Sequence, residues 1–190
     1  MTSRPALQVT VPFDTRRAES LRAGDAVLLS GTIYTARDAA HERLAGLITR
    51  RLPLPVDLRD QVVYYCGPTP PRPGRPIGSA GPTTASRMDA YTPLILDATG
   101  LRAMIGKGKR SAEVRAAMMR QRAVYFGAVE GTAALLGACV RDAAVVAFPD
   151  LGPEAIHRLV VERFPVVVVN DVHGGDVYEE GRARYRRAPA

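Results

Sequence analysis

Short apolar runs divide the chain into alternating helices and strands. From residue 86 onward, each stretch with apolar residues at helical spacing is followed by a run of mostly apolar residues. This pattern predicts helices over 86–98, 111–122, 132–140 and 153–163, and strands over 101–105, 123–126, 143–148 and 166–169. Because such alternation is typical of β–α units, we expect an α/β fold whose sheet is largely parallel in the C-terminal half.

The first half of the chain is less regular. Apolar runs predict strands over 7–11, 26–30 and 62–65, which could form a second sheet layer. Thr35 and Asp38 have the spacing of a helix cap, so a helix is predicted over 36–50. Ten of the 17 residues from 66 to 82 are Pro or Gly, which we interpret as a shaped loop rather than a linker.

Length and composition are those of a globular domain. The 190 residues are 46% hydrophobic and 24% charged, which is enough apolar material for one core. We predict a single domain over 1–175 and a basic, flexible tail over 176–190, a segment with four arginines among its last nine residues. No apolar run approaches the roughly 18 residues that span a bilayer. With no recognisable secretory signal and only two cysteines, Cys66 and Cys139, we expect a cytoplasmic protein with reduced thiols.

A self-sufficient catalytic set is absent from the sequence pattern. The three histidines (His41, His157 and His173) are scattered, and neither cysteine has a metal-ligand spacing, so no metal site is expected in this chain. The net charge of +7 instead favours an anionic partner. Glycines and a cation precede a predicted helix in three segments, 31–37, 78–87 and 105–111.

These three segments predict one anion site. Helix N-termini offer amide donors and a partial positive charge, and the carboxyl ends of parallel strands lie along one edge of a sheet. We therefore expect Arg37, Arg87 and Lys107 to converge on a pocket for a small polyanion or dicarboxylate. Thr83 and Thr84 could cap a helix or direct hydroxyls into that pocket. Solvated surface positions remain the alternative for each cation.

The same segments resemble a known enzyme family. The stretches GTIYTARDAAHERL (31–44), YYCGPT (64–69), IGSAGPTTASRMDAYTP (77–93), IGKGKRS (105–111), VYFGAVEGTAALL (124–136) and VVAFPDLGPEAIHRLVVERFP (145–165) are similar to class I fumarate hydratases. The resemblance is to their C-terminal domain, which in many bacteria and archaea is a separate β subunit. L-tartrate dehydratase β subunits share the arginine, GPTT and GKG segments, whereas the YYCGPT, IGSAGPTTASRMDAYTP and AFPDLGPEAI strings look more like fumarases.

The resemblance implies a swivelling β/β/α three-layer domain that closes over an active site shared with an α subunit. That partner would hold a [4Fe–4S] cluster on three cysteines, with one iron open to the substrate. Arg37, Arg87 and Lys107 would hold the substrate carboxylates. The family role of base at C3 falls on Thr83, for which a positioning hydroxyl is the alternative because an alcohol is a poor base.

We therefore expect the β subunit of a fumarate hydratase that interconverts (S)-malate and fumarate, in a homo- or hetero-oligomer. It should be inactive without the α subunit, because two cysteines cannot hold the cluster. An L-tartrate dehydratase β subunit is the near alternative, since residues 171–175 depart from the usual fumarase string. The second alternative is a non-catalytic module that binds dicarboxylates or nucleic acid. We expect neither a membrane nor a nucleic-acid partner.

Overall fold

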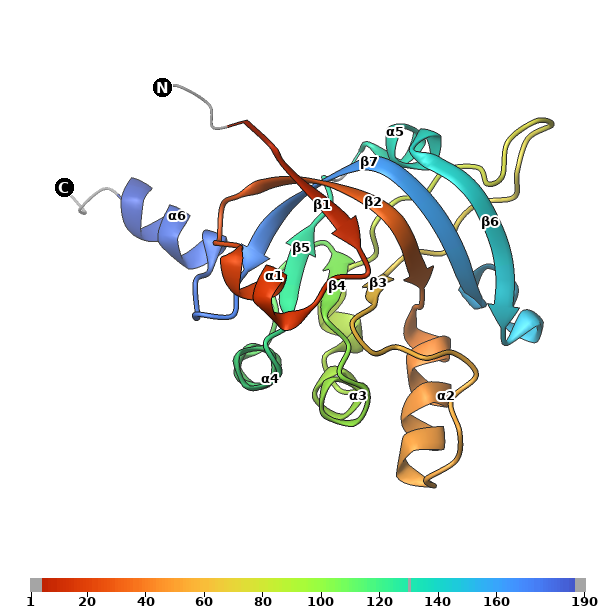
Figure 1. Ribbon diagram of the computed structural model, residues 1–190, viewed down its shortest axis with the longest axis horizontal. Helices are drawn as coiled ribbons and strands as arrows, with labels where there is room; N and C mark the ends of the chain where they lie inside the picture. Colours follow the sequence, from red (N-terminus) through yellow and green to blue (C-terminus); the bar gives the residue numbers. More distant parts are fainter. Residues whose placement is uncertain (1–4, 130, 187–190) are drawn as a thin grey trace.

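A mixed seven-stranded sheet organises the chain, and the helices over 38–49, 92–99 and 112–121 cover one side of it (Figure 1). The computed structural model describes residues 5–129 and 131–186. The strands are β1 (Leu7–Val11), β2 (Ala26–Thr35), β3 (Val62–Tyr64), β4 (Ala103–Gly106), β5 (Val124–Gly127), β6 (Val140–Ala147) and β7 (Ile156–Asn170). The helices are α1 (Thr15–Ser20), α2 (Asp38–Thr49), α3 (Thr92–Thr99), α4 (Ala112–Gln121), α5 (Ala133–Ala138) and α6 (Val177–Tyr185), with 3₁₀ turns η1 (Ala85–Met88) and η2 (Pro149–Glu154). The α/β class is confirmed.

The strand order β1-β2-β3-β4-β5-β7-β6 combines a parallel and an antiparallel part. Neighbours from β1 to β5 run parallel, whereas β7 runs antiparallel to β2, β5 and β6. Because β7 pairs with both β2 and β5, the sheet is partly closed on itself. The prediction of a largely parallel sheet in the C-terminal half is therefore wrong, since β6 and β7 pair antiparallel there and three of the five parallel strands lie in the first half of the chain.

The long strand β7 replaces the helix predicted over 153–163. Ile156 and Leu159 explain the error: both are buried, but they lie on opposite faces of β7 in different cores, so their three-residue spacing is like that of a helix. A bulge follows at the end of the predicted helix, where Val161 pairs with Gly31 and Phe164 with Leu29. Arg163 takes a positive φ of 52° inside this bulge. Val161 and Phe164 therefore both reach one core although they are three residues apart.

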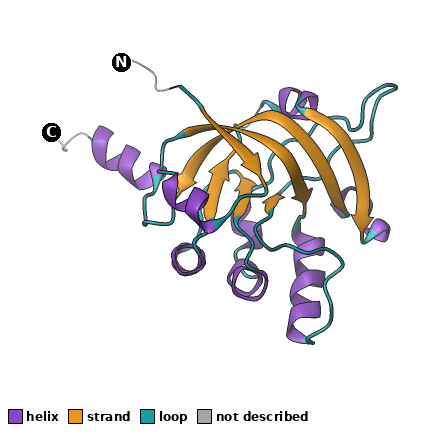
Figure 2. Ribbon diagram, viewed as in Figure 1, coloured by secondary structure: helices purple, strands orange, loops and turns teal. Residues whose placement is uncertain are grey.

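Two cores lie on opposite sides of the short strands β3, β4 and β5. Val62 and Tyr64 belong to the core shared with the long strands, and Val63 and Tyr65 belong to the core shared with α2, α3 and α4. Figure 2 shows the long strands, the short strands and these helices in succession. The alternation of buried side chains along β3 follows from the two-residue period of a strand.

Several helix boundaries differ from the prediction. Thr35 ends β2 instead of capping a helix, and its Oγ1 donates a hydrogen bond to the carbonyl oxygen of Ala155 at 3.3 Å. The helix predicted from residue 86 begins only at Thr92, where Pro93 occupies the first turn. Its expected first half forms η1, with non-helical residues between the two elements.

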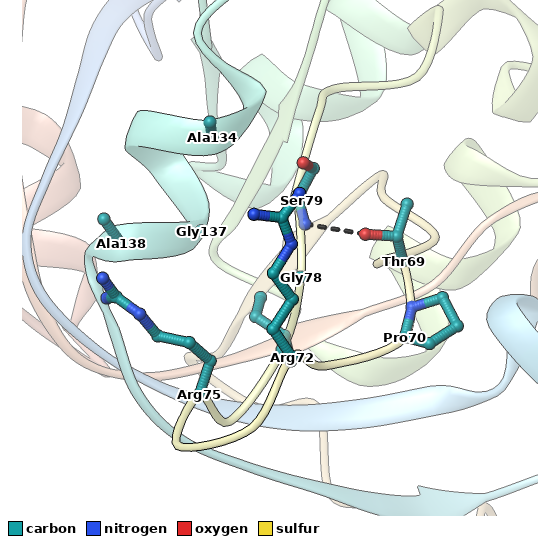
Figure 3. Close-up of a pocket in the computed structure, with 10 residues that line it drawn as sticks. Thr69, Pro70, Arg72, Arg75, Gly78, Ser79, Ala134, Gly137 and Ala138 are labelled. Carbon is teal, nitrogen blue, oxygen red and sulfur yellow. Dashed lines mark hydrogen bonds between the residues drawn. The ribbon is translucent and has the colours of Figure 1, made fainter.

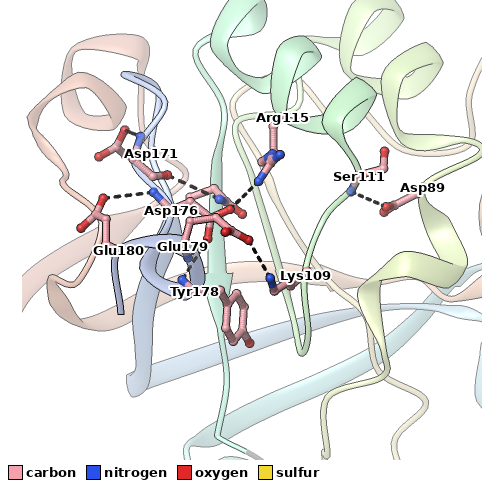
Figure 4. Close-up of polar contacts among 11 residues, drawn as sticks. Asp89, Lys109, Ser111, Arg115, Asp171, Asp176, Tyr178, Glu179 and Glu180 are labelled. Atoms are coloured by element: carbon pink, nitrogen blue, oxygen red, sulfur yellow. Dashed lines mark hydrogen bonds and ion pairs between the residues drawn. The ribbon is translucent and has the colours of Figure 1, made fainter. Parts of the chain in front are cut away.

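The C-terminal segment is attached to the domain by ion pairs. Lys109 Nζ lies 2.6 Å from Glu179 Oε1, and Arg115 Nη1 lies 2.6 Å from Asp176 Oδ2 (Figure 4). Asp176 also caps α6 by accepting the amides of Tyr178 and Glu179. The division into a domain and a flexible tail stays a prediction, and residues 187–190 lie outside the described part of the chain. Within that part, no helix is long and apolar enough to cross a membrane.

Arg110 is a charged residue at the centre of the helix-side core. Its side chain is 0% exposed, and its Nε lies 2.8 Å from Asp89 Oδ1. Nη1 donates to the Tyr65 hydroxyl at 2.9 Å and Nη2 to Thr92 Oγ1 at 2.8 Å. The guanidinium also lies over the rings of Tyr65 and Tyr125, at 5.2 and 5.1 Å. These partners compensate the desolvation of the charge.

We expect Arg110→Ala to lower the free energy of unfolding by at least about 3 kcal/mol, because it leaves Asp89 without its counter-ion next to a new cavity. Arg120→Ala is the control, since Arg120 pairs with Asp97 at 2.7 Å but is 54% exposed. Arg120→Ala should lower the free energy of unfolding by at most about 1 kcal/mol. Urea titration at pH 7 measures both values, and equal losses would contradict a central role for Arg110.

Candidate functional site

The predicted site residues follow the carboxyl ends of parallel strands. Arg37 comes two residues after the end of β2, and Lys107 comes directly after β4. Thr83 and Arg87 belong to the segment between β3 and β4. The Thr83 amide donates to the carbonyl oxygen of Tyr65 at 2.6 Å, which ties this segment to the end of β3. All four residues thus lie toward the same edge of the sheet.

Backbone hydrogen bonds join Thr83 and Lys107. The Lys107 amide donates to the carbonyl oxygen of Thr83 at 3.2 Å, and the Ala85 amide donates to that of Lys107 at 2.8 Å. Thr84 and Lys107 form a parallel β-bridge. Gly106 permits this approach, because a Cβ there would lie 3.2 Å from the Ala85 Cβ and 2.9 Å from the Tyr65 ring. The threonine segment and the glycine–lysine turn are therefore one structural unit.

Arg37 and Arg87 meet at the carboxylate of Asp38. Arg87 Nε donates to Asp38 Oδ1 at 2.7 Å, whereas Arg37 Nη2 lies 3.7 Å from Asp38 Oδ2. Glu154 Oε1 lies 3.5 Å from the same Nη2. Arg37 and Glu154 line an open surface depression of about 570 Å³, together with Asp38, Ala39, Glu42, Tyr91, Leu151 and Pro153.

Arg37 retains donors that can bind an anion. Its Nη2 lies 3.7 and 3.5 Å from its two carboxylate partners, distances longer than ordinary hydrogen bonds, whereas its Nε is buried out of reach of a ligand. Gly67 lets the guanidinium lie close to the backbone, because a Cβ on Gly67 would be 3.2 Å from Arg37 Nη1. A carboxylate matches the geometry of this planar group, because it can accept two parallel N–H bonds.

The structure thus brings the four residues together in two pairs on one edge, Arg37 with Arg87 and Thr83 with Lys107. Their roles in substrate binding and catalysis stay predictions. The helix starts, by contrast, are already bound by carboxylates of the chain itself: Glu154 accepts the Ala39 amide of α2 at 3.1 Å, and Asp89 accepts the Ser111 amide before α4 at 2.7 Å. Gly31 lies inside β2 rather than in a turn. Anion binding at these two helix starts would therefore depend on side chains.

Asp38 and Glu154 are the site residues that sequence reasoning missed. Asp38 was assigned to a helix cap with Thr35, although its position next to Arg37 offered a signal. No local signal connects Glu154 with Arg37, because the two residues lie in different parts of the chain. The two carboxylates offset part of the positive charge of Arg37, Arg87 and Lys107.

Two buried groups lie beneath the site. The His41 imidazole contacts the Tyr65 ring edge-on, with centroids 5.2 Å apart, and its Nδ1 is 2.9 Å from the carbonyl oxygen of Arg37. Burial lowers the pKa of His41 to about 4, and nearby Arg110 acts in the same direction. Burial raises the pKa of the Cys66 thiol to about 12 despite the charge of Arg37. Both groups are therefore neutral at pH 7.

The Pro- and Gly-rich loop has a defined shape, as predicted. Thr69 Oγ1 accepts the Ser79 amide at 2.7 Å (Figure 3). Gly137 of α5 packs so closely against the loop that a Cβ there would clash with the carbonyl oxygen of Gly78. The loop and α5 enclose a second depression of about 290 Å³, which Arg72 and Arg75 also line.

The donor set of this chain does not suit an iron–sulfur cluster. Among the described residues, no group of three or more His, Cys, Asp or Glu side chains could hold a metal ion. Both cysteines are free thiols; Cys66 is buried after β3, and Cys139 follows α5. Cluster binding needs more thiolates than the two that are present.

Comparison with known proteins places the chain in a family. The family model described as "Fumarase C-terminus" matches residues 4–181. The chain is 40% identical over 153 residues to "Fumarate hydratase class I, anaerobic" of Escherichia coli, which covers 80% of this chain and 28% of that protein. It is 37% identical over 167 residues to "Putative L(+)-tartrate dehydratase subunit beta" of Methanocaldococcus jannaschii, covering 85% of this chain and 86% of that protein.

A third relative is a "Putative fumarate hydratase class I" of Geobacillus stearothermophilus, 32% identical over 183 residues, with 94% of this chain and 35% of that protein covered. The chain thus spans only about 28% of the length of the first curated relatives that it matches. The tartrate dehydratase subunit, in contrast, corresponds to this chain over most of both lengths.

The low pKa of His41 predicts a pH dependence of stability. The pKa is 6.5 in the unfolded chain and about 4 in the folded protein, so the unfolded state binds more protons between these values. The free energy of unfolding should therefore fall as the pH drops from 6.5 to 4, by about 3 kcal/mol in total, and level off below pH 4.

Urea titrations at pH 7 and pH 4.5 measure this contribution. His41→Phe should remove most of the difference between the two pH values, because phenylalanine has no ionisable group. His173→Phe is the control, since His173 is exposed, and it should retain the difference. The prediction fails if His41→Phe keeps the full loss of stability at pH 4.5.

Proposed function

This chain belongs to the fumarase C-terminus family, and from that premise we propose that it supplies the dicarboxylate-binding residues of a hydro-lyase that interconverts (S)-malate and fumarate. The observation that carries the proposal is the grouping of Arg37 with Arg87 around Asp38. The Thr83–Lys107 unit lies at the same edge of the sheet. A four-carbon diacid has two carboxylates, and these residues offer two guanidinium groups and one ammonium group.

The proposed reaction gives each residue a task. Removing a proton next to a carboxylate places additional negative charge on that carboxylate, and fixed cations stabilise the charge as it develops. Arg37 and Arg87 would grip carboxylates through paired N–H donors, and Lys107 would add a compact charge. Thr83 would act at C3 as base or would position the substrate through its hydroxyl. The backbone link between Thr83 and Lys107 holds the two residues in a fixed relation, which suits either role.

The rest of the enzyme would come from a partner, the α subunit, which would hold the [4Fe–4S] cluster. The cysteines of this chain do not fit such a cluster, and much longer fumarate hydratases match it over only part of their length. We propose that the domain closes over the shared site by a swivelling movement, within a hetero-oligomer in the cytoplasm. The isolated chain should accordingly show no turnover of malate or fumarate.

L-tartrate dehydratase activity is the second candidate. The relative from M. jannaschii, named as a putative subunit of that enzyme, corresponds to this chain over most of both lengths. Co-expression with a cluster-bearing partner chain, followed by assays with (S)-malate and L-tartrate, separates the two. Turnover of tartrate without turnover of malate would overturn the fumarate hydratase proposal.

We expect Arg87→Ala to reduce kcat/KM of the assembled enzyme at least 100-fold, equivalent to about 3 kcal/mol of transition-state stabilisation. The reason is the loss of a carboxylate-binding guanidinium. Arg72→Ala removes an exposed arginine from the other depression and should leave kcat/KM unchanged. Steady-state assays of fumarate formation at 240 nm measure both variants. Full activity of the Arg87→Ala enzyme would remove this residue from the site.

A further inference from the structure

Asp38 places a negative charge directly between two arginines that we assign to anion binding. Its Oδ1 accepts the Arg87 Nε–H bond at 2.7 Å, and its Oδ2 is buried 3.7 Å from Arg37 Nη2 with no hydrogen bond among the described residues. A carboxylate at this position opposes the binding of a dianion by simple repulsion. The presence of Asp38 between these arginines therefore calls for a role that offsets this repulsion.

We propose that Asp38 is a positioning residue that fixes Arg37 and Arg87 as a pair spaced for the carboxylates of a dicarboxylate substrate. This inference rests on the proposed function. The Arg87 side chain is 55% exposed and extends from the short turn η1, so it would otherwise sample many rotamers. Holding such a side chain in one rotamer costs conformational entropy, which Asp38 offsets before the substrate binds.

The bond pattern leaves the substrate-binding end of Arg87 available. Among the described residues, its ion pair uses Nε alone. The two terminal nitrogens therefore remain for a carboxylate, which can accept two parallel N–H bonds from them. A contact through Nε sets the direction of the guanidinium without using its terminal donors.

Asp38 is itself held at a fixed point. It is the first residue of α2, and the next amide, that of Ala39, donates to Glu154 at 3.1 Å. On the other side, the carbonyl oxygen of Arg37 lies 2.8 Å from the His41 amide nitrogen and 2.9 Å from His41 Nδ1. The helix start therefore provides a rigid reference for both arginines.

The direction in which Asp38→Asn changes the affinity for a dianion tests the proposal. If Asp38 acts only through its charge, Asp38→Asn should bind a dianion more tightly, because the repulsion is gone. If Asp38 positions the arginines, the same variant should bind more weakly, because a neutral amide holds a guanidinium poorly. Succinate is a suitable probe, since it is a four-carbon dicarboxylate that cannot be dehydrated.

We expect Asp38→Asn to raise the Kd of the full chain for succinate at least 10-fold, measured by NMR titration. Asp38→Glu, which keeps the charge but moves it by one methylene, should also weaken binding. Glu42→Gln is the matched control: Glu42 is an exposed acid on the same depression, and its removal should leave the Kd unchanged or lower it. Circular dichroism at the titration temperature verifies that each variant is folded.

Coupling to Arg87 distinguishes positioning from a general structural role. In the Arg87→Ala background, Asp38→Asn should have a much smaller effect on the Kd, because half of the pair is already missing. In the assembled enzyme, Asp38→Asn should raise KM and lower kcat, whereas Glu42→Gln should change neither. Tighter succinate binding by folded Asp38→Asn, or equal effects with and without Arg87, would overturn the inference. Absence of malate and fumarate turnover by the assembled unaltered enzyme would overturn the proposed function, whereas the succinate titrations test this inference separately.

Discussion

The buried pair of Arg110 and Asp89 is the interaction on which the candidate site depends. Arg110 follows Lys107 by three residues, and Asp89 follows Arg87 by two, so the pair joins the two segments that carry these cations. Asp89 also accepts the Ser111 amide, which fixes the start of α4 (Figure 4). Because the charge is fully desolvated, its geometry tolerates little movement. The position of the glycine–lysine turn relative to η1 is thus set from inside the core.

The local pattern of the sequence predicted the elements that local rules determine. The strands 7–11 and 62–65 and the helix 111–122 lie within one residue of β1, β3 and α4, since the alternating burial of a strand and the Ser111 cap are visible in the sequence. The helix predicted over 153–163 failed because Ile156 and Leu159 are buried on opposite faces of a strand. Only the pairing of β7 with β2, β5 and β6 reveals this strand, and pairing partners distant in the chain leave no local pattern.

The candidate site was predictable to a similar extent. The argument from strand ends placed Arg37, Arg87 and Lys107 along one edge, and the structure joins them in two contacting groups with Asp38 and Thr83. The positions of strand ends in the sequence could not reveal that the chain's own carboxylates bind the starts of α2 and α4. Nor could they reveal that Arg110, in the same IGKGKRS string as Lys107, is buried while Lys109 is exposed. Burial depends on the tertiary neighbours Tyr65, Thr92 and Tyr125, which come from three other segments.

The wrong helix over 153–163 and the missed contact between Glu154 and Arg37 share one cause. Glu154 reaches Arg37 because η2 leads into β7, and β7 begins beside the end of β2. Thr35 secures this junction: its Oγ1 bonds the Ala155 carbonyl oxygen, and the His157 amide donates to the same Oγ1 at 3.0 Å. A helix over 153–163 would not form the strand pairing that holds this junction against β2. The antiparallel return of β7 therefore both closes the sheet and delivers one of the two carboxylates that hold Arg37, so the charge balance of the site is a consequence of the sheet topology.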